Sequence, residues 1–127
     1  MVGRIRTVVF IAAASLVLGG CGGGSTTVVQ GIRVLKIIDV HETEYALSPK
    51  SIHIKRFGYY GIKAVNDGTA AHALAVEGHG IDKKTANVAP GKSATLLVFF
   101  RKAGKYTLYC PIDGHEQKGM KATVKVH

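Results

Sequence analysis

Several features are missing from this 127-residue chain, and each absence argues against a class of protein. From residue 32 onward, no stretch repeats its apolar residues every 3.6 positions over the length of a helix, which argues against a helical domain. The apolar run at residues 7–18 is shorter than the about 20 residues that a transmembrane helix needs. Helix-turn-helix, zinc-finger and RNA-recognition patterns are missing, so nucleic acid is a poor candidate partner. There are no internal repeats, and the length fits one domain.

Acidic residues are also scarce. The chain has 8 of them against 17 lysines and arginines, which gives a net charge of +9. A basic surface suits an anionic protein partner or the anionic face of a membrane.

Residues 1–20 have the pattern of a secretory signal peptide. A basic segment containing Arg4 and Arg6 precedes the apolar run, and small residues follow it. The end of this segment, "LGGC" at residues 18–21, resembles the bacterial lipobox, in which the cysteine becomes lipidated. The resemblance implies that Cys21 carries two acyl chains, which suffice for stable membrane anchoring. The alternative is an ordinary cysteine in an uncleaved or differently cleaved signal.

Residues 21–31 are rich in glycine, serine and threonine, a composition that predicts a flexible tether with a reach of roughly 17 Å. The folded domain is then expected to occupy residues 32–127. If Cys21 carries lipid, the other cysteine of the chain, Cys110, has no partner. An unpaired thiol in an oxidising compartment tends to pair or react. We therefore expect Cys110 to be either buried and inert or held by a metal.

The domain is predicted to consist of short β-strands. Apolar and polar residues alternate with a period of two along residues 51–57, 59–67, 104–110 and 121–126. Turn signals rich in glycine, proline and asparagine separate these runs. The pattern is typical of an all-β sandwich or barrel. Residues 77–88 are polar and contain glycines, and we expect them to form a loop, with a helical turn at most.

Three residues with metal-binding side chains lie close together near the C-terminus: Cys110, His115 and Met120. A trigonal set of two histidines and one cysteine, with a weak axial methionine, is the arrangement of a blue copper site. Zinc prefers four strong ligands from Cys, His, Asp or Glu. Taken singly, the cysteine and the methionine would be core residues and the histidine a solvated loop residue. Their joint spacing favours a copper site instead.

A second histidine must come from elsewhere in the chain. The best candidate is His72, which follows the turn at residues 66–68 and begins the next strand. His79, in a glycine-flanked segment, is the alternative. Asn66 is a candidate for tying this part of the chain together. The remaining histidines are expected to be solvated: His41, His53 and His127.

Two segments, "NDGTAAHALAVEG" and "APGKSATLLVFFRKAGKYTLYCPIDGHEQKGM", resemble the cupredoxins, the family that includes the plastocyanins, azurins and auracyanins. The resemblance covers residues 44–126, and the spacing of Cys110 and His115 is closer to azurin and auracyanin loops than to the shorter plastocyanin loop. It implies an eight-stranded Greek-key β-sandwich that binds copper through His72, Cys110, His115 and Met120. By the same resemblance, His115 would be the exposed ligand through which electrons pass.

The predicted function is that of a membrane-tethered type 1 blue copper protein that carries single electrons. It would be exported, and anchored to the outer face of the cytoplasmic membrane or located in the periplasm. Its expected partners are cytochromes or respiratory complexes with an acidic docking face, and the chain is expected to be a monomer. Lys118 and Lys121 predict a basic copper end, where Ala73 and Ile112 would contribute to an apolar patch.

Two other functions stay open. A copper-storage or copper-delivery protein would use the same ligands, although the methionine- and histidine-rich tracts that favour it are missing. A metal-free cupredoxin-like interaction module is disfavoured by the complete set of cysteine, histidine and methionine. An enzyme is not expected, because copper oxidases and nitrite reductases need a second copper centre, and most of the six histidines here are scattered.

Overall fold

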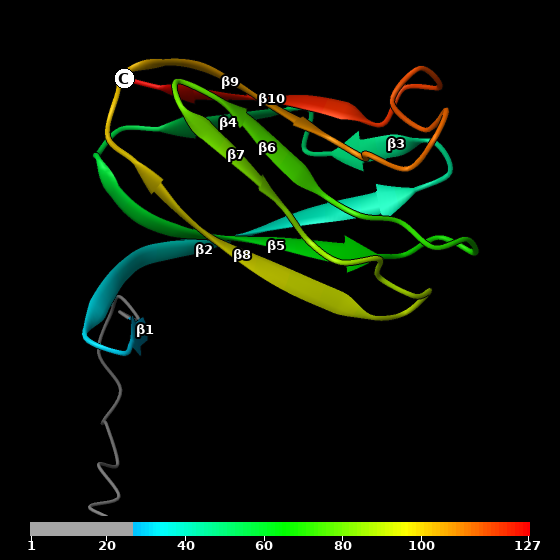
Figure 1. Cartoon of the computed structure of the whole chain (residues 1–127), viewed down its shortest axis with the longest axis horizontal. Coiled ribbons are helices and arrows are strands. Elements are labelled where there is room, and N and C mark those ends of the chain that lie inside the picture. Colours follow the sequence, from blue (N-terminus) through cyan, green and yellow to red (C-terminus); the bar gives the residue numbers. More distant parts are fainter. Residues whose placement is uncertain (1–26) are drawn as a thin grey trace, which may run out of the picture.

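Two β-sheets packed face to face make up residues 27–127, the part of the chain that the computed structural model describes (Figure 1). The strand order is β1-β2-β5-β8 in the first sheet, where β3 also pairs with β2, and β4-β10-β9-β6-β7 in the second. No helix among the described residues has the length and apolar character to cross a membrane. The predicted signal peptide, Cys21 and most of the predicted tether lie outside the described residues.

The prediction of an all-β sandwich is confirmed. The first sheet consists of β1 (Thr27–Val29), β2 (Ile32–Thr43), β3 (Ala46–Ser48), β5 (Gly58–Asn66) and β8 (Ser93–Phe100). The second consists of β4 (Ser51–Ile54), β6 (Ala75–Gly78), β7 (Ile81–Lys84), β9 (Gly104–Tyr109) and β10 (Lys121–Val126). The pairs β2–β5 and β4–β10 are parallel, and the other pairs are antiparallel. The described part has ten strands rather than eight, and two of them, β1 and β3, are short pieces of 3 residues beside β2.

The core lies between the sheets because successive side chains of a strand point to opposite faces. In β10, Ala122, Val124 and Val126 are buried, whereas Lys121 and Lys125 are exposed. The alternation predicted from the sequence therefore identifies the inward face correctly. The largest fully buried apolar side chains come from both sheets and from the segment before β6: Leu47, Ile54, Ile62, Leu74, Phe100, Tyr106 and Leu108.

The prediction of a loop over residues 77–88 is wrong for residues 77–84. These residues complete β6 and form β7, and the two strands are joined by a two-residue turn at His79 and Gly80. Both turn residues have positive φ, 48° and 83°, as the tight turns that match the strand twist require. The polar sequence misled because β7 is an edge strand, where charged residues are common and protect the edge from further pairing.

The strand directions define two ends of the sandwich. Segments 67–74, 85–92 and 111–120 form one end, here called the ligand end, and segments 30–31, 55–57, 79–80 and 101–103 form the far end. The 9 residues of β5 run from the far end to the ligand end and span about 26 Å at about 3.3 Å per residue. Figure 1 shows the ligand-end loops together on the right, with the start of β2 on the left.

Candidate metal centre

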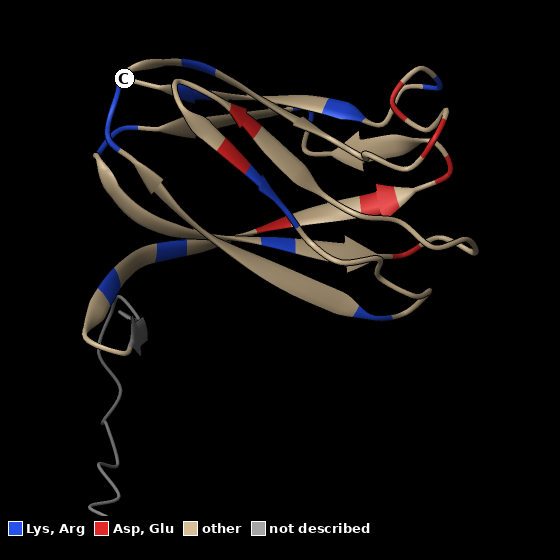
Figure 2. Ribbon diagram, in the orientation of Figure 1, with Lys and Arg blue, Asp and Glu red and all other residues tan. Residues whose placement is uncertain are grey.

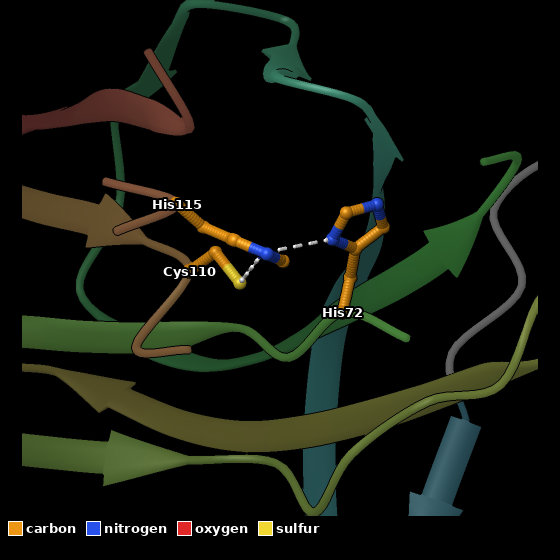
Figure 3. A group of neighbouring side chains, drawn as sticks. All are labelled: His72, Cys110 and His115. Carbon is orange, nitrogen blue, oxygen red and sulfur yellow. Dashed lines mark hydrogen bonds between the residues drawn. The ribbon is translucent and has the colours of Figure 1, made fainter. Parts of the chain in front are cut away.

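Three of the four predicted ligands converge at the ligand end. One ligand atom each of His72, Cys110 and His115 lies within 4.8 Å of the other two. The two histidine Nδ1 atoms are 3.3 Å apart, and Cys110 Sγ is 3.5 Å from His115 Nδ1. Figure 3 shows His72 approaching from one side and Cys110 with His115 from the other. His72 and Cys110 are buried, whereas His115 is partly exposed.

The segment that carries His72 is held in place by Asn66, as the sequence suggested. The buried Asn66 side chain donates to the carbonyl oxygens of Ala70 and Val88, both at 2.8 Å, and accepts from Gly68 N–H at 2.9 Å. His72 also exchanges two backbone hydrogen bonds with Val88, of 3.1 and 2.6 Å. A buried polar side chain with all of these partners fixes the loop, so the imidazole has a defined position.

Glu44 orients the His72 ring, and no local sequence pattern identifies it. Its Oε1 lies 3.0 Å from His72 Nε2 and accepts from the N–H groups of Thr69 and Ala70 at 2.8 and 2.7 Å. These hydrogen bonds, led by that of Ala70, lower the pKa of Glu44 to about 2. A carboxylate at Nε2 places the ring proton there and leaves the Nδ1 lone pair directed at the site.

Cys110 follows the end of β9, and its N–H donates to the Met120 carbonyl at 3.1 Å. Burial raises the pKa of the Cys110 thiol, while backbone hydrogen bonds from Ala73 and Ile112 lower it. Pro111 has no N–H to offer, so the sulfur faces these two backbone groups and His115 Nδ1. A metal ion would hold the thiol in its deprotonated form, which is the form that ligates.

Segment 111–120 is a compact loop that presents His115. His115 N–H donates to the Ile112 carbonyl at 3.0 Å, and Met120 N–H donates to the His115 carbonyl at 3.2 Å. Gly114, with φ of 77°, allows the chain to turn back toward Cys110. The Tyr45 ring meets His115 edge to face, with the centroids 5.2 Å apart.

Met120 is fully buried directly before β10. Its carbonyl and its N–H tie it to Cys110 and His115, the two other ligand residues of this segment. Its role as the weak fourth ligand stays a prediction.

A second carboxyl group, that of Glu42, lies in the interior. Its side chain is fully buried, and neither oxygen has a hydrogen-bond partner among the described residues. Burial raises the pKa of Glu42 to about 7. Its charge in turn raises the pKa of Cys110, so an ionised Glu42 disfavours the thiolate.

The other histidines lie too far from His72, Cys110 and His115 to act as ligands. His79 is in the far-end turn, packed on Tyr106 with the ring centroids 4.8 Å apart, so the structure does not support it as the alternative ligand. The three histidines expected to be solvated are exposed: His41, His53 and His127.

The ligand end carries charges of both signs, so it is not the purely basic surface that Lys118 and Lys121 predict on their own. Lys118 lies over the Tyr45 ring at 4.3 Å, and Lys121 pairs with Glu116 at 3.2 Å. Figure 2 shows both red and blue segments at this end, where the acidic residues are Glu44, Asp67, Asp113 and Glu116 and the exposed lysines include Lys50, Lys92, Lys118 and Lys121. Ala73 is only 1% exposed, so it cannot contribute to a surface patch, whereas Ile112 is partly exposed and can.

Comparison with known proteins identifies the fold. Residues 25–127 match the sequence profile of the family described as multicopper oxidase. No curated protein matches the chain. Auracyanin B superimposes with a TM-score of 0.66 at 18% identity, over 83% of this chain and 96% of that one. Auracyanin from Roseiflexus castenholzii gives a TM-score of 0.64 at 19% identity, over 83% and 99%.

A crystal structure of a multicopper oxidase gives a TM-score of 0.62 at 17% identity, over 82% of this chain but 46% of that one. At these identities the likeness concerns the fold, and the prediction of a cupredoxin sandwich is confirmed. The donor set of two imidazoles and one thiol fits the copper ion that such proteins hold.

Proposed function

The chain belongs to the multicopper oxidase family, and from this premise we propose that it is a type 1 blue copper protein that carries single electrons between redox partners. The convergence of His72, Cys110 and His115 is the observation that carries the proposal. Copper, when bound, supplies a one-electron couple between Cu(I) and Cu(II). The likeness to auracyanins, one of them described as a "blue" copper protein, supports the same function.

The surroundings of the ligands suit electron transfer because they allow little movement. His72 is held by Glu44 at Nε2 and by its backbone bonds to Val88. Cys110 and His115 are both tied to the backbone of Met120, where β10 begins. Cu(I) and Cu(II) prefer different geometries, so a site that moves little has a small reorganisation energy on electron transfer.

The electron is proposed to leave through His115, the partly exposed member of the three. Tyr45, which is 37% exposed, contacts this ring and extends the surface around it. We place the redox partner, a cytochrome or a respiratory complex, at the ligand end. Because charges of both signs lie there, the partner's docking face is proposed to pair with the ligand-end lysines, as an acidic face would, and also with the carboxylates between them.

A carrier is favoured over an oxidase by the ligands available. Within residues 27–127, a single group of histidine, cysteine or acidic side chains has the spacing of a metal site. An oxidase needs a second copper centre with further histidines. The N-terminal pattern leads us to propose that the carrier is exported and lipid-anchored through Cys21 to the outer face of the cytoplasmic membrane. We also propose that it acts as a monomer.

The test is a titration of the protein with Cu(II), followed by visible absorption. An intense blue charge-transfer band that disappears in Cys110→Ser supports a thiolate–copper site. Cys21→Ser is the matched control and should keep the band. Copper uptake without the band would point to storage or delivery, and no uptake would leave a metal-free interaction module.

A further inference from the structure

A groove of about 500 Å³ lies on the side of the sandwich where β2 and β4 run. Four cationic side chains line it, Arg33 and Lys36 from β2 and Lys55 and Arg56 from the loop after β4. No acidic residue takes part in its lining. The pairing of cationic walls with apolar residues such as Leu35 suits a ligand that is anionic at one part and apolar at another.

The neighbouring far end continues the same chemistry. Its loops 55–57 and 101–103 carry Lys55, Arg56, Arg101 and Lys102, with no acidic residue. Figure 2 shows this basic character at the start of β2 and at the loops beside it. Phe57, directly after Lys55 and Arg56, is 52% exposed, the largest exposed fraction among the large apolar side chains of the described residues. Cations around an exposed aromatic ring are the composition of surfaces that sit in the membrane interface.

The position of this surface separates it from the redox partner's site. The groove runs along β4, and its cationic part with the loops 55–57 and 101–103 lies at the opposite end of β5 from the ligands, about 26 Å away by strand length. A redox partner docked here would be far from His115. The described chain also enters the domain here, since β1 pairs with residues Ile32, Arg33 and Val34 of β2.

We propose that the groove and the loops 55–57 and 101–103 form a docking surface for anionic phospholipid headgroups. Phe57 enters the interface, and the cations contact the lipid phosphates. The domain then stands with its far end on the membrane and its ligand end toward solution. This surface consists of residues of the folded domain, so the proposal depends neither on copper nor on lipidation of Cys21.

The absence of tryptophan from the chain provides a direct test. In the full chain, Phe57→Trp introduces the single tryptophan at the proposed surface, and Tyr45→Trp introduces it at the ligand end as a control. Each is mixed with vesicles of phosphatidylcholine alone or of phosphatidylcholine with phosphatidylglycerol. Binding through the N-terminal segment with Arg4 and Arg6 would be common to both tryptophan variants, so the difference between the two variants is the readout. We expect a blue shift of emission for Phe57→Trp with the anionic vesicles, reversed by salt, and none for Tyr45→Trp.

A pair of charge variants in the Phe57→Trp background locates the contact. Lys55→Gln with Arg56→Gln should weaken docking by about fivefold for each cation, judged from the fraction of emission that shifts. Lys84→Gln with Lys92→Gln removes the same charge from exposed positions near the ligand end and should leave docking unchanged.

Three results would overturn the proposal. The first is no shift with the anionic vesicles. The second is an equal loss in both charge pairs, because binding would then follow net charge alone. The third is binding of polyglutamate, but not of vesicles, through Lys55 and Arg56, since the surface would then serve an acidic protein.

Discussion

The ligand end and the far end of the sandwich differ in how their charged side chains are distributed. At the ligand end, buried polar groups such as Asn66 and His72 are fixed by hydrogen bonds, and the exposed side chains of its loops carry charges of both signs. At the far end, loops 55–57 and 101–103 carry cations and no acidic residue, and Phe57 stands exposed among them. The net charge of +9 is spread unevenly over the chain. The net charge of the whole chain therefore does not predict which kind of partner binds at which end.

The largest expected effect contrasts a histidine from each end. His72→Ala removes a ligand and should abolish the blue band, with copper affinity falling by more than about 100-fold, since loss of an outer-shell partner alone costs about 10–100-fold. His79→Ala, at the far end, should leave both unchanged because it lies outside the ligand cluster. Copper titration of both variants is the measurement, and a retained band in His72→Ala would contradict the assignment.

Glu42 should give the largest effect on stability. Its pKa is about 7 in the fold against 4.5 in the unfolded chain, so between these values the folded state holds a proton that the unfolded state has lost. The stability of the metal-free protein is therefore full below pH 4.5 and falls by on the order of 3 kcal/mol as pH rises through about 7. Denaturant unfolding of metal-free protein across this range is the measurement.

Glu42→Gln is the variant that isolates this carboxyl group. The neutral side chain cannot ionise, so the variant should be more stable than the natural protein at pH 8 by about 2–3 kcal/mol. At pH 4 the two should be nearly equal, because Glu42 is then protonated. The same loss of stability with pH in both proteins would show that another group is responsible.

Glu44 should affect the metal rather than the fold. Glu44→Gln keeps the size of the side chain but removes the carboxylate that holds His72 Nε2. We expect copper affinity to fall about 10–100-fold, the usual cost of losing an outer-shell partner. The blue band should persist at saturating copper, because all the ligand residues remain. Unchanged affinity would show that the backbone bonds of His72 suffice to orient it.

The smallest effect is expected at the ligand-end surface. Glu116→Gln breaks an ion pair with Lys121, whose side chain is 58% exposed. Exposed pairs contribute about 0–1 kcal/mol, so thermal stability and copper affinity should barely change. Glu116→Gln is therefore the charge-matched control for Glu44→Gln. A large change would mean that the conformation of segment 111–120 depends on this contact.

Local patterns accounted for most of the fold and for the ligand segment. The period-two alternation predicted the buried faces of β5, β9 and β10, since neighbouring side chains of any strand point to opposite sides. The alternation did not reveal β7, because this edge strand pairs with β6 alone and its exposed charged residues have the composition of a loop. Cys110, His115 and Met120 were recognisable because one short loop carries all three.

The sequence by itself determined the alternating strands of the β-sandwich and the close spacing of Cys110, His115 and Met120 that predicts a copper site. These depend on short-range spacing, which a single segment displays. Only the tertiary structure brought His72 from another segment to Cys110 and His115, and decided that Glu44, 28 residues before His72, would orient its ring. It also decided that Glu42 would be buried without a partner among the described residues, and that the basic loops 55–57 and 101–103 would meet at the far end. The pairing of distant strands sets which loops meet, and no local pattern records that pairing.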